Sequence, residues 1–443
     1  MEPWKKTLYI MWLAQFSSLM GFSFVLPFMP FYVRQLGVEG DANIAWWAGI
    51  ASAATSFTLT IFSPIWGHVA DRYGRKAMVL RSMFGGAIVL LLTGFAPNIT
   101  WLCILRALQG AVTGTMTASV ALVASTTPSY RSAYALGLMQ AAAFAGSSVG
   151  PYLGGKMWDL WGSRAPFLVA SCVLVAAGML VKFGVQEQFR RHTSRAGGRE
   201  AAAQRGSFAE VFAASGFLVA VLVLFQIQFG TMARQPVFVL FIEKLYGTHE
   251  GVATFVGQLL AVSGVVAALS AGVFGRFSDR LGHKRLLAYS TLAAGLIVLP
   301  QAVAGNVWQL AALQVLFGLA VAGIGPSANA IIRRAVPDRN IAKAYGLSAS
   351  LTSLGSGLGP LVGGYLAGPA GLGLRAPFLF TGVVLVITAG VALIALKSPT
   401  AALDVTEPQL EAARTVPAPA VALDPEEGSP TGESEATPGA PAP

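Results

Sequence analysis

The sequence predicts an all-α membrane protein with twelve transmembrane helices arranged as two pseudo-symmetric six-helix bundles. Three observations lead to this fold class. Of the 443 residues, 11% are charged and 54% are hydrophobic, and the mean hydropathy is +0.63, whereas a soluble domain is about a quarter charged. Twelve apolar stretches are each long enough to cross about 30 Å of hydrocarbon. Two unlike motifs each occur twice, in the same order and at nearly the same offset along the chain.

The apolar stretches are expected to be helices, because lipid offers no hydrogen-bond partner to an exposed backbone. They lie at 7–33, 45–66, 79–97, 101–125, 133–157, 165–185, 214–241, 252–275, 286–304, 308–332, 342–367 and 376–397. The first stretch is too long for the apolar part of a signal peptide and precedes no small-residue cleavage site. It is therefore predicted to be a retained span.

Basic residues set the predicted orientation. With a cytoplasmic N-terminus, the inner loops and tails hold 23 Lys and Arg residues and the outer loops hold five. This excess predicts that both termini are cytoplasmic. Inner loops that face anionic membrane lipid also account for the net charge of +10, so no nucleic-acid partner is expected.

The duplication and the composition divide the chain into four segments. Residues 1–185 form the N-terminal six-helix half and 214–397 the C-terminal half, joined by a basic cytoplasmic linker at 186–213. The tail at 398–443 is rich in proline and acidic residues, cannot bury a core and is predicted to be disordered in the cytoplasm. The two cysteines form no spaced framework, so neither a disulfide nor a metal site is predicted.

The first repeated motif follows the second span of each half. Residues 67–76 read GHVADRYGRK, and residues 275–284 read GRFSDRLGHK. Gly67 and Gly74 would permit a tight turn where two helices meet, and Asp71 is expected to cap the next helix. The repetition disfavours the alternative of a basic loop that only fixes topology. The candidate residues are Gly67, Asp71, Arg72, Gly74, Arg75, Lys76, Gly275, Asp279, Arg280 and Gly282.

The second repeated motif lies inside spans five and eleven. Residues 146–155 read GSSVGPYLGG, and residues 355–364 read GSGLGPLVGG. Small residues let helices approach closely, and a proline frees a carbonyl group and bends the helix. The motif residues are Gly146, Gly150, Pro151, Gly154, Gly155, Gly355, Gly359, Pro360, Gly363 and Gly364.

With these motifs the sequence resembles the major facilitator superfamily, and within it the twelve-span drug:proton antiporters. The first motif matches the family's signature loop, which implies that Asp71 and Arg75 latch the halves and bias the outward-facing state. His283 stands where the first copy has Arg75, so the second latch is expected to be weaker. The second motif matches the antiporter signature G-x-x-x-G-P-x-x-G-G. Roughly residues 4–397 share the resemblance, which extends to bacterial multidrug exporters.

The predicted spans contain no carboxylate, and two arginines lie well inside them, Arg106 in span four and Arg234 in span seven. A charge in mid-membrane is costly and usually functional, although each side chain could also snorkel or hold helices together. The resemblance implies a role for Arg106 in proton transfer and a cavity lined by spans one, four, seven and ten. We therefore expect an electropositive cavity that prefers neutral or anionic amphiphiles. The polar candidates for a proton or substrate site are Arg106, Gln109, Arg234, Gln15, Gln226 and Asn329, and each amide could equally well pack against a neighbouring helix.

The favoured function is a secondary carrier in the bacterial cytoplasmic membrane, expected as a monomer. It would export drugs or toxic amphiphiles in exchange for protons by rocking its two halves about a central site. One alternative is efflux of a sugar or organic-anion metabolite, and a remote one is a transport-inactive sensor or scaffold. Neither enzyme chemistry nor a cofactor is predicted, because the sequence shows no metal-ligand cluster and no Ser/His/Asp arrangement.

Overall fold

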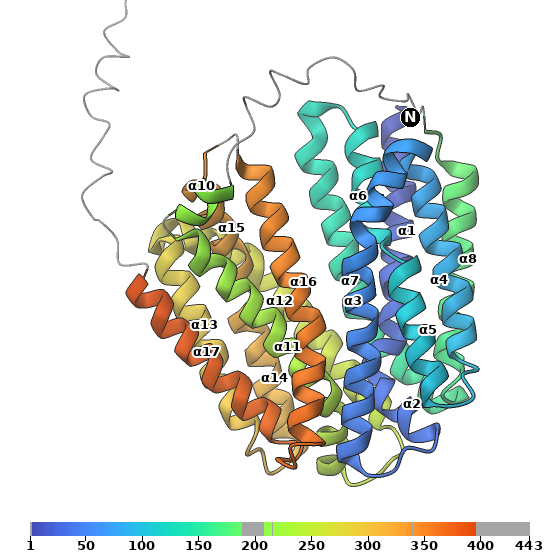
Figure 1. Cartoon of the computed structure of the whole chain (residues 1–443), viewed down its shortest axis with the longest axis vertical. Coiled ribbons are helices and arrows are strands. Elements are labelled where there is room, and N and C mark those ends of the chain that lie inside the picture. The colour runs from blue at the N-terminus through green and yellow to red at the C-terminus, as the bar shows by residue number, and fades with distance from the viewer. Residues whose placement is uncertain (1, 188–207, 215, 338–339, 396–443) are drawn as a thin grey trace, which may run out of the picture. The chain divides into compact units, whose positions relative to one another are not determined.

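The computed structural model describes residues 2–187, 208–214, 216–337 and 340–395. Most of the predicted linker and the whole of the predicted tail, 398–443, lie outside the described residues. Residues Met1–Leu396 form one compact unit. Figure 1 shows that the described part of this unit consists of helices, in agreement with the predicted all-α class.

Both halves have six helical segments, and some segments are broken into two helices. The N-terminal half contains α1 (Pro3–Val25), η1 (Leu26–Phe28), α2 (Met29–Gln35), α3 (Asp41–Tyr73), α4 (Arg75–Thr93), α5 (Ile99–Val112), α6 (Thr115–Thr126), η2 (Ser129–Arg131), α7 (Ser132–Trp161) and α8 (Ala165–Gly184). The C-terminal half contains α11 (Phe217–Tyr246), α12 (Val252–Leu281), α13 (His283–Gln301), α14 (Val307–Val321), α15 (Ile324–Ala335), α16 (Ile341–Ala367) and α17 (Ala376–Ala395), and the short helix α10 (Phe208–Ala213) precedes it in the last part of the predicted linker.

Nine helical segments in the described residues are long and apolar enough to cross a membrane. The remaining long helices, α7, α13 and α16, contain 30, 19 and 27 residues. At 1.5 Å per residue each is about 28 Å or longer. The arrangement is therefore consistent with the twelve predicted spans.

Glycine and proline explain where spans break. The first span changes from α1 to α2 through η1, where Pro27 and Pro30 occupy early helical positions that need no backbone N–H donor. The fourth span breaks between α5 and α6 at Gly114, whose φ of +118° is strained for a residue with a side chain. The tenth span breaks at the corresponding place, between α14 and α15.

The first motif makes its turn with one glycine and not with two as predicted. Gly74 separates α3 from α4 with φ of +96°, and Gly282 separates α12 from α13 with φ of +87°. Gly67 and Gly275 instead lie inside α3 and α12 with ample space around them. The expectation that Gly67 shapes the turn is therefore wrong, because the helix continues past it to Tyr73.

The second motif packs each of its helices against the first span of the same half. A Cβ atom on Gly146 or Gly150 would lie 2.5 Å from atoms of α1, and one on Gly154 would overlap the Phe24 carbonyl. In the other half, a Cβ atom on Gly355 or Gly359 would lie 2.9 or 2.5 Å from carbonyl oxygens of α11, and one on Gly363 would overlap the Ala233 carbonyl. These three-glycine stripes let backbones touch, as predicted. Both helices continue through Pro151 and Pro360.

The fourth glycine of each motif faces the other half. A Cβ atom on Gly155 would overlap the Ala253 carbonyl of α12, and one on Gly364 would lie 2.8 Å from the Ala45 carbonyl of α3. The facing helices carry matching glycines. Gly257 of α12 lies against the Pro151 carbonyl, and Gly49 of α3 lies against the Pro360 carbonyl. Two equivalent seams, α7 with α12 and α3 with α16, thus join the halves.

Candidate functional site

The contacts between the halves concentrate at one end of the helices. We call it the gate end: α2, the start of α3, the end of α7 and the α11–α12 connection. The seams run inward from there, and their farthest described glycine contacts are Gly264 against Ser148 and Gly357 against Phe57. Toward residues 67–76 and 275–284, which we call the motif end, exposed apolar side chains replace these contacts in the described parts of α3 and α12.

An ion pair joins the halves at the gate end. Arg34 of α2 donates from Nη1 and Nη2 to the two carboxylate oxygens of Glu243 on α11, at 2.6 and 2.7 Å. The Glu243 side chain is only 10% exposed. Arg34 also contacts Asp41 at 3.2 Å, and His249 Nδ1 lies 2.6 Å from Glu243 Oε1. Bidentate Arg–carboxylate pairs are among the stronger charged contacts in proteins.

A second carboxylate at the gate end belongs to the N-terminal half and binds the C-terminal half. Asp159 of α7 accepts a hydrogen bond from the backbone N–H of Thr254, at 2.7 Å, in the first turn of α12. An acid at a helix N-terminus also interacts favourably with the helix dipole. Each half therefore contributes one carboxylate that binds the other half.

The helices extend past the predicted spans at this end. Span seven is predicted to end at 241, yet α11 continues to Tyr246, so that Glu243 lies within a helix that also qualifies as a candidate span. The prediction that every carboxylate lies outside the spans therefore holds for the apolar stretches but not for the helices. The sequence carries a signal for this extension, because Leu245 and Tyr246 resume the apolar character of the helix after the two charged residues Glu243 and Lys244.

At the motif end, the residues of the first motif bind within their own half. Glu187, just after α8, caps α4 by accepting the backbone N–H groups of Arg75 and Lys76, both at 2.9 Å. Gly74, and not Asp71, occupies the N-cap position of this helix. The side chains of Asp71 and Asp279 lie outside the described part of the structure.

Two basic residues of this motif bind backbone carbonyl groups of neighbouring helices. Arg75 Nη1 donates to the Ala121 carbonyl in the middle of α6, at 2.9 Å. Lys76 Nζ donates to the Lys182 and Val185 carbonyls at the end of α8, at 2.8 and 2.6 Å. A cation is favoured at the negative end of α8. Arg72 is exposed.

The second copy of the motif uses different contacts. Ser278 Oγ lies 2.6 Å from His283 Nδ1 and 3.2 Å from the Ser327 hydroxyl on α15. Arg280 is exposed. The described contacts of the second copy thus join a serine hydroxyl to a histidine and to another serine, whereas the first copy uses a carboxylate and two cations.

Arg234 is buried in the C-terminal half, with 3% of its surface exposed. Its Nη1 donates to Gln301 Oε1 on α13 at 2.7 Å, and its Nε donates to the Gly230 carbonyl at 3.3 Å. The guanidinium lies 4.2 Å from the centre of the Phe317 ring on α14. A cation–π contact in a desolvated site is worth about 2 kcal/mol. Neutral groups therefore stabilise this charge, and no ion pair to it is found among the described residues.

Arg234 also borders a cavity of about 170 Å³. Most of the lining comes from α11, and Pro27 contributes from the N-terminal half. Gln314 of α14 lines the same cavity and accepts a hydrogen bond from Gln301 Nε2 at 3.3 Å. Gln235, a further lining residue, has a buried side-chain oxygen without a hydrogen-bond partner. The cavity thus combines one positive charge, unused amide capacity and an apolar wall, lined by Met232, Phe238, Val239 and Leu260.

Arg106 is also buried, with 4% of its surface exposed, but the side chain that binds it belongs to the same helix, α5. Its Nη1 donates to Gln109 Oε1 at 2.6 Å, and its Nε has no partner. Arg106 and Gln109 are the only two of the six predicted polar candidates that a described hydrogen bond joins. Thr55 Oγ1 of α3 donates to the Arg106 carbonyl at 2.9 Å, as Ser263 Oγ of α12 donates to the Gln314 carbonyl at 3.0 Å.

The three remaining amide candidates lie on different helices and differ in burial. Gln15 is fully buried in α1, and neither of its side-chain amide atoms has a hydrogen-bond partner among the residues that the structure describes. Gln226 is half-buried in α11. Asn329 is exposed in α15, where its backbone carbonyl accepts a bond from the Tyr345 hydroxyl at 3.2 Å.

Residues that sequence reasoning missed are those whose partners lie far along the chain. Neither Glu243 nor Gln301 is among the predicted site residues, and Glu187 is not among the predicted caps. Glu187 follows span six closely, and Gln301 interrupts an apolar stretch, so both carry a weak signal. Among the described residues, no group of three His, Cys, Asp or Glu side chains could hold a metal ion.

A family model confirms the resemblance. The model described as Major Facilitator Superfamily matches this chain at residues 11–272 and again at residues 236–425. The two matches together cover most of the chain.

Curated relatives match along nearly their whole length. The chain is 34% identical over 387 residues to the multidrug resistance protein MdtG of Proteus mirabilis, with 86% of this chain and 94% of the relative covered. It is also 34% identical to the protein of the same name in Salmonella paratyphi B, with 86% and 93% covered.

Solved structures share the fold at low identity. A bacterial homologue of the human lysosomal transporter Spinster, in an inward-facing and unoccupied conformation, matches with a TM-score of 0.72 at 16% identity. That match covers 89% of this chain and 97% of the other. A single-residue mutant of the nucleoside transporter NupG also gives 0.72, at 15% identity and with 89% and 100% covered.

Proposed function

Because the chain belongs to the major facilitator superfamily and is a transporter, not an enzyme, we propose that it exports drugs or other toxic amphiphiles in exchange for protons. It would act as a monomer in the cytoplasmic membrane of a bacterium, with both termini inside. The name shared by the curated relatives, multidrug resistance protein, supports this substrate class.

Alternating access would use the seams and the gate end. With cytoplasmic termini, the gate end faces outward, and the Arg34–Glu243 pair and the Asp159–Thr254 bond close it in the described conformation. Opening toward the outside must break both contacts. The glycine–carbonyl seams allow the halves to roll on each other, because no side chains interlock at those points.

The cavity beside Arg234 is the observation that carries the proposed substrate chemistry. At about 170 Å³ it is smaller than the ~300–1,000 Å³ of a drug-sized site. It would therefore hold the polar head of an amphiphile, while the apolar part lies against Met232, Phe238 and Leu260. A buried cation that has no acidic partner in the described part of the chain favours a neutral or anionic head over a cationic one.

Efflux of an organic-anion metabolite is the second candidate, and the same buried cation favours it. The two functions differ in breadth of substrate. A drug exporter should accept several unrelated amphiphiles, whereas a metabolite carrier should accept one molecule and its close analogues.

Reconstitution in liposomes tests the proposal. We expect efflux of a fluorescent anionic amphiphile to accelerate when protons are more concentrated on the outer side, and an imposed sodium gradient to have no effect. Transport that is indifferent to an imposed pH gradient would show that proton exchange is wrong. Tighter binding of a lipophilic cation than of a matched anion to the purified protein would overturn the electropositive cavity.

Drug susceptibility of cells that express the chain provides a second test. The resemblance predicts that Asp71→Asn abolishes resistance, since this residue would latch the halves. Equal resistance with the variant and the parent chain would contradict the latch.

A further inference from the structure

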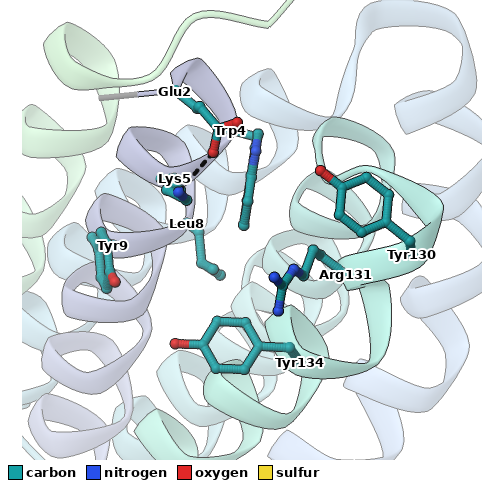
Figure 2. A pocket seen from close by; sticks show the side chains of 8 residues that line it. All are labelled: Glu2, Trp4, Lys5, Leu8, Tyr9, Tyr130, Arg131 and Tyr134. Carbon is teal, nitrogen blue, oxygen red and sulfur yellow. Dashed lines mark ion pairs between the residues drawn. The ribbon is translucent and has the colours of Figure 1, made fainter.

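A cavity of about 470 Å³ lies at the motif end of the N-terminal half, away from the Arg234 site and the seams. The start of α1, the short helix η2 and the first turn of α7 form it, and Figure 2 shows the side chains that surround it. Four of them are aromatic and two are basic. The lining consists of Glu2, Trp4, Lys5, Leu8, Tyr9, Tyr130, Arg131 and Tyr134.

Arg131 is the charged group of this cavity for which the described residues provide no ion-pair partner. Glu2 is paired with Lys5 at 2.7 Å. The hydrogen bond from Lys5 and its positive charge lower the pKa of the Glu2 carboxyl, so this carboxylate remains ionised and paired with Lys5 at neutral pH. Among the described residues, Arg131 makes no ion pair. Its described contact is with the Tyr130 ring, 5.8 Å away. In Figure 2 its guanidinium points into the space between Leu8 and Tyr134.

The aromatic side chains place this cavity at a membrane boundary. Trp4 begins the first candidate span, and Tyr134 lies in the first turn of α7. Tyr9, Tyr130 and Tyr134 are exposed. Trp and Tyr concentrate at the depth of lipid head groups, where one end of the ring is apolar and the other is wet. A basic cavity at that depth suits a head group that carries a negative phosphate.

We propose that this cavity binds the phosphodiester of an anionic phospholipid, with Arg131 as its principal ligand and the aromatic side chains flanking the glycerol. Arg forms bidentate hydrogen bonds to phosphate, and Lys5 would add attraction without a fixed geometry. The site does not depend on the transported substrate, so its test is independent of the proposed function.

The test uses the full chain, purified and placed in mixed phosphatidylglycerol and phosphatidylcholine, with the lipids that stay bound counted by native mass spectrometry. We expect phosphatidylglycerol to be retained preferentially. One basic residue near a membrane surface is worth about 1 kcal/mol, so Arg131→Gln should lower this retention about fivefold. Arg131→Lys should restore part of it.

Arg164→Gln is the matched control, since Arg164 also lies beside an aromatic ring, at 5.4 Å from the centre of Phe95, but borders the opposite end of α7. It should retain lipid like the parent chain. Equal retention of the two lipids by the parent chain would overturn the proposal, and this arm needs no variant. Displacement of the bound lipid by millimolar inorganic phosphate would show a site for free phosphate instead, and would also overturn it.

Discussion

The two halves share their seams but differ in the polar side chains that they bury. Gly49 on α3 and Gly257 on α12 occupy equivalent places, each against the carbonyl group of a proline on the facing helix. In the interior, by contrast, Arg106 is bound by a residue of its own helix. Arg234 reaches a different helix and borders a cavity. Backbone contacts are thus symmetric, and side-chain chemistry is not.

This difference has a physical reason. Rocking of the halves requires that both seams move at the same time. At each seam two backbones are in direct contact, so neither of them can carry an additional side-chain atom. An interior charge has no such constraint, because it needs only some set of neutral partners. The halves can therefore diverge in chemistry while the seams stay matched.

Valine at either seam glycine should have the largest effect. The added side chain of Gly49→Val or Gly257→Val would overlap a carbonyl group that cannot rotate away. Overpacking costs about 1–3 kcal/mol where neighbours can adjust, and more where backbone is the neighbour. Both variants should lose nearly all efflux from proteoliposomes. Gly390→Val, whose Cβ meets nothing within 4 Å, is the control. Loss of efflux in only one of the two variants would show that the two seams are not functionally equivalent.

The two buried arginines should respond differently to the same change. Arg234→Gln removes the charge at the cavity, and a hydrogen bond to a charged group contributes about 1.5–3 kcal/mol. Binding of an anionic amphiphile should therefore weaken by roughly 10- to 100-fold, measured by fluorescence titration. Arg106→Gln should change this affinity less than about threefold while it alters the pH dependence of efflux. If both variants weaken binding equally, the two sites are not distinct.

Removing the charge of Glu243 should open the gate end. Glu243→Gln cannot form the ion pair to Arg34, and the pair is intermediate between exposed and buried ones. A cost of about 2 kcal/mol, or roughly thirtyfold in the conformational equilibrium, is expected. Spin labels at the exposed Ile65 and Val273, near the motif end, should report a shorter distance as this end closes.

The more exposed Asp41 provides the control for this pair. Asp41→Asn loses a single contact of 3.2 Å, so its label distances should match those of the parent chain. A label distance unchanged in Glu243→Gln would show that the pair does not hold the gate closed.

The smallest effect is expected at the cap of α4, which has no described acidic counterpart at the start of α13. Glu187→Gln keeps the size of the side chain but weakens its bonds to the first turn of α4. Loss of a helix cap costs about 1 kcal/mol. The thermal midpoint in detergent should fall by a few degrees at most, with exposed Glu39→Gln as control. A midpoint equal to that of the control would mean that the cap adds nothing.

The fold was predictable from local properties of the chain. Apolar length determines which segments cross the membrane, because an unpaired backbone group in lipid costs several kcal/mol. The repeated Gly-Pro motif identified the helices α7 and α16 that form the seams. Their partners Gly49 and Gly257 repeat at the same offset and could have been found by the same comparison.

Details of the first motif could not be derived in this way. Gly67 is expected in the turn, yet α3 continues past it to Tyr73. Asp71 is expected to cap α4, but Gly74 occupies the N-cap position, and Glu187 accepts the N–H group of Arg75 from 112 positions away in sequence. In both cases the predicted role was based on neighbouring residues in the sequence, whereas contacts with other helices determine the structure at these positions.

By itself, the sequence determined the membrane class, the duplication and the presence of two arginines among apolar residues, since each depends only on composition and order. Tertiary structure alone decided that Arg34 meets Glu243 and that Arg234 meets Gln301. The reason is that a span in lipid is apolar on nearly every side, so its periodicity does not reveal which face meets a neighbour. Only the packing of the helices sets that rotation.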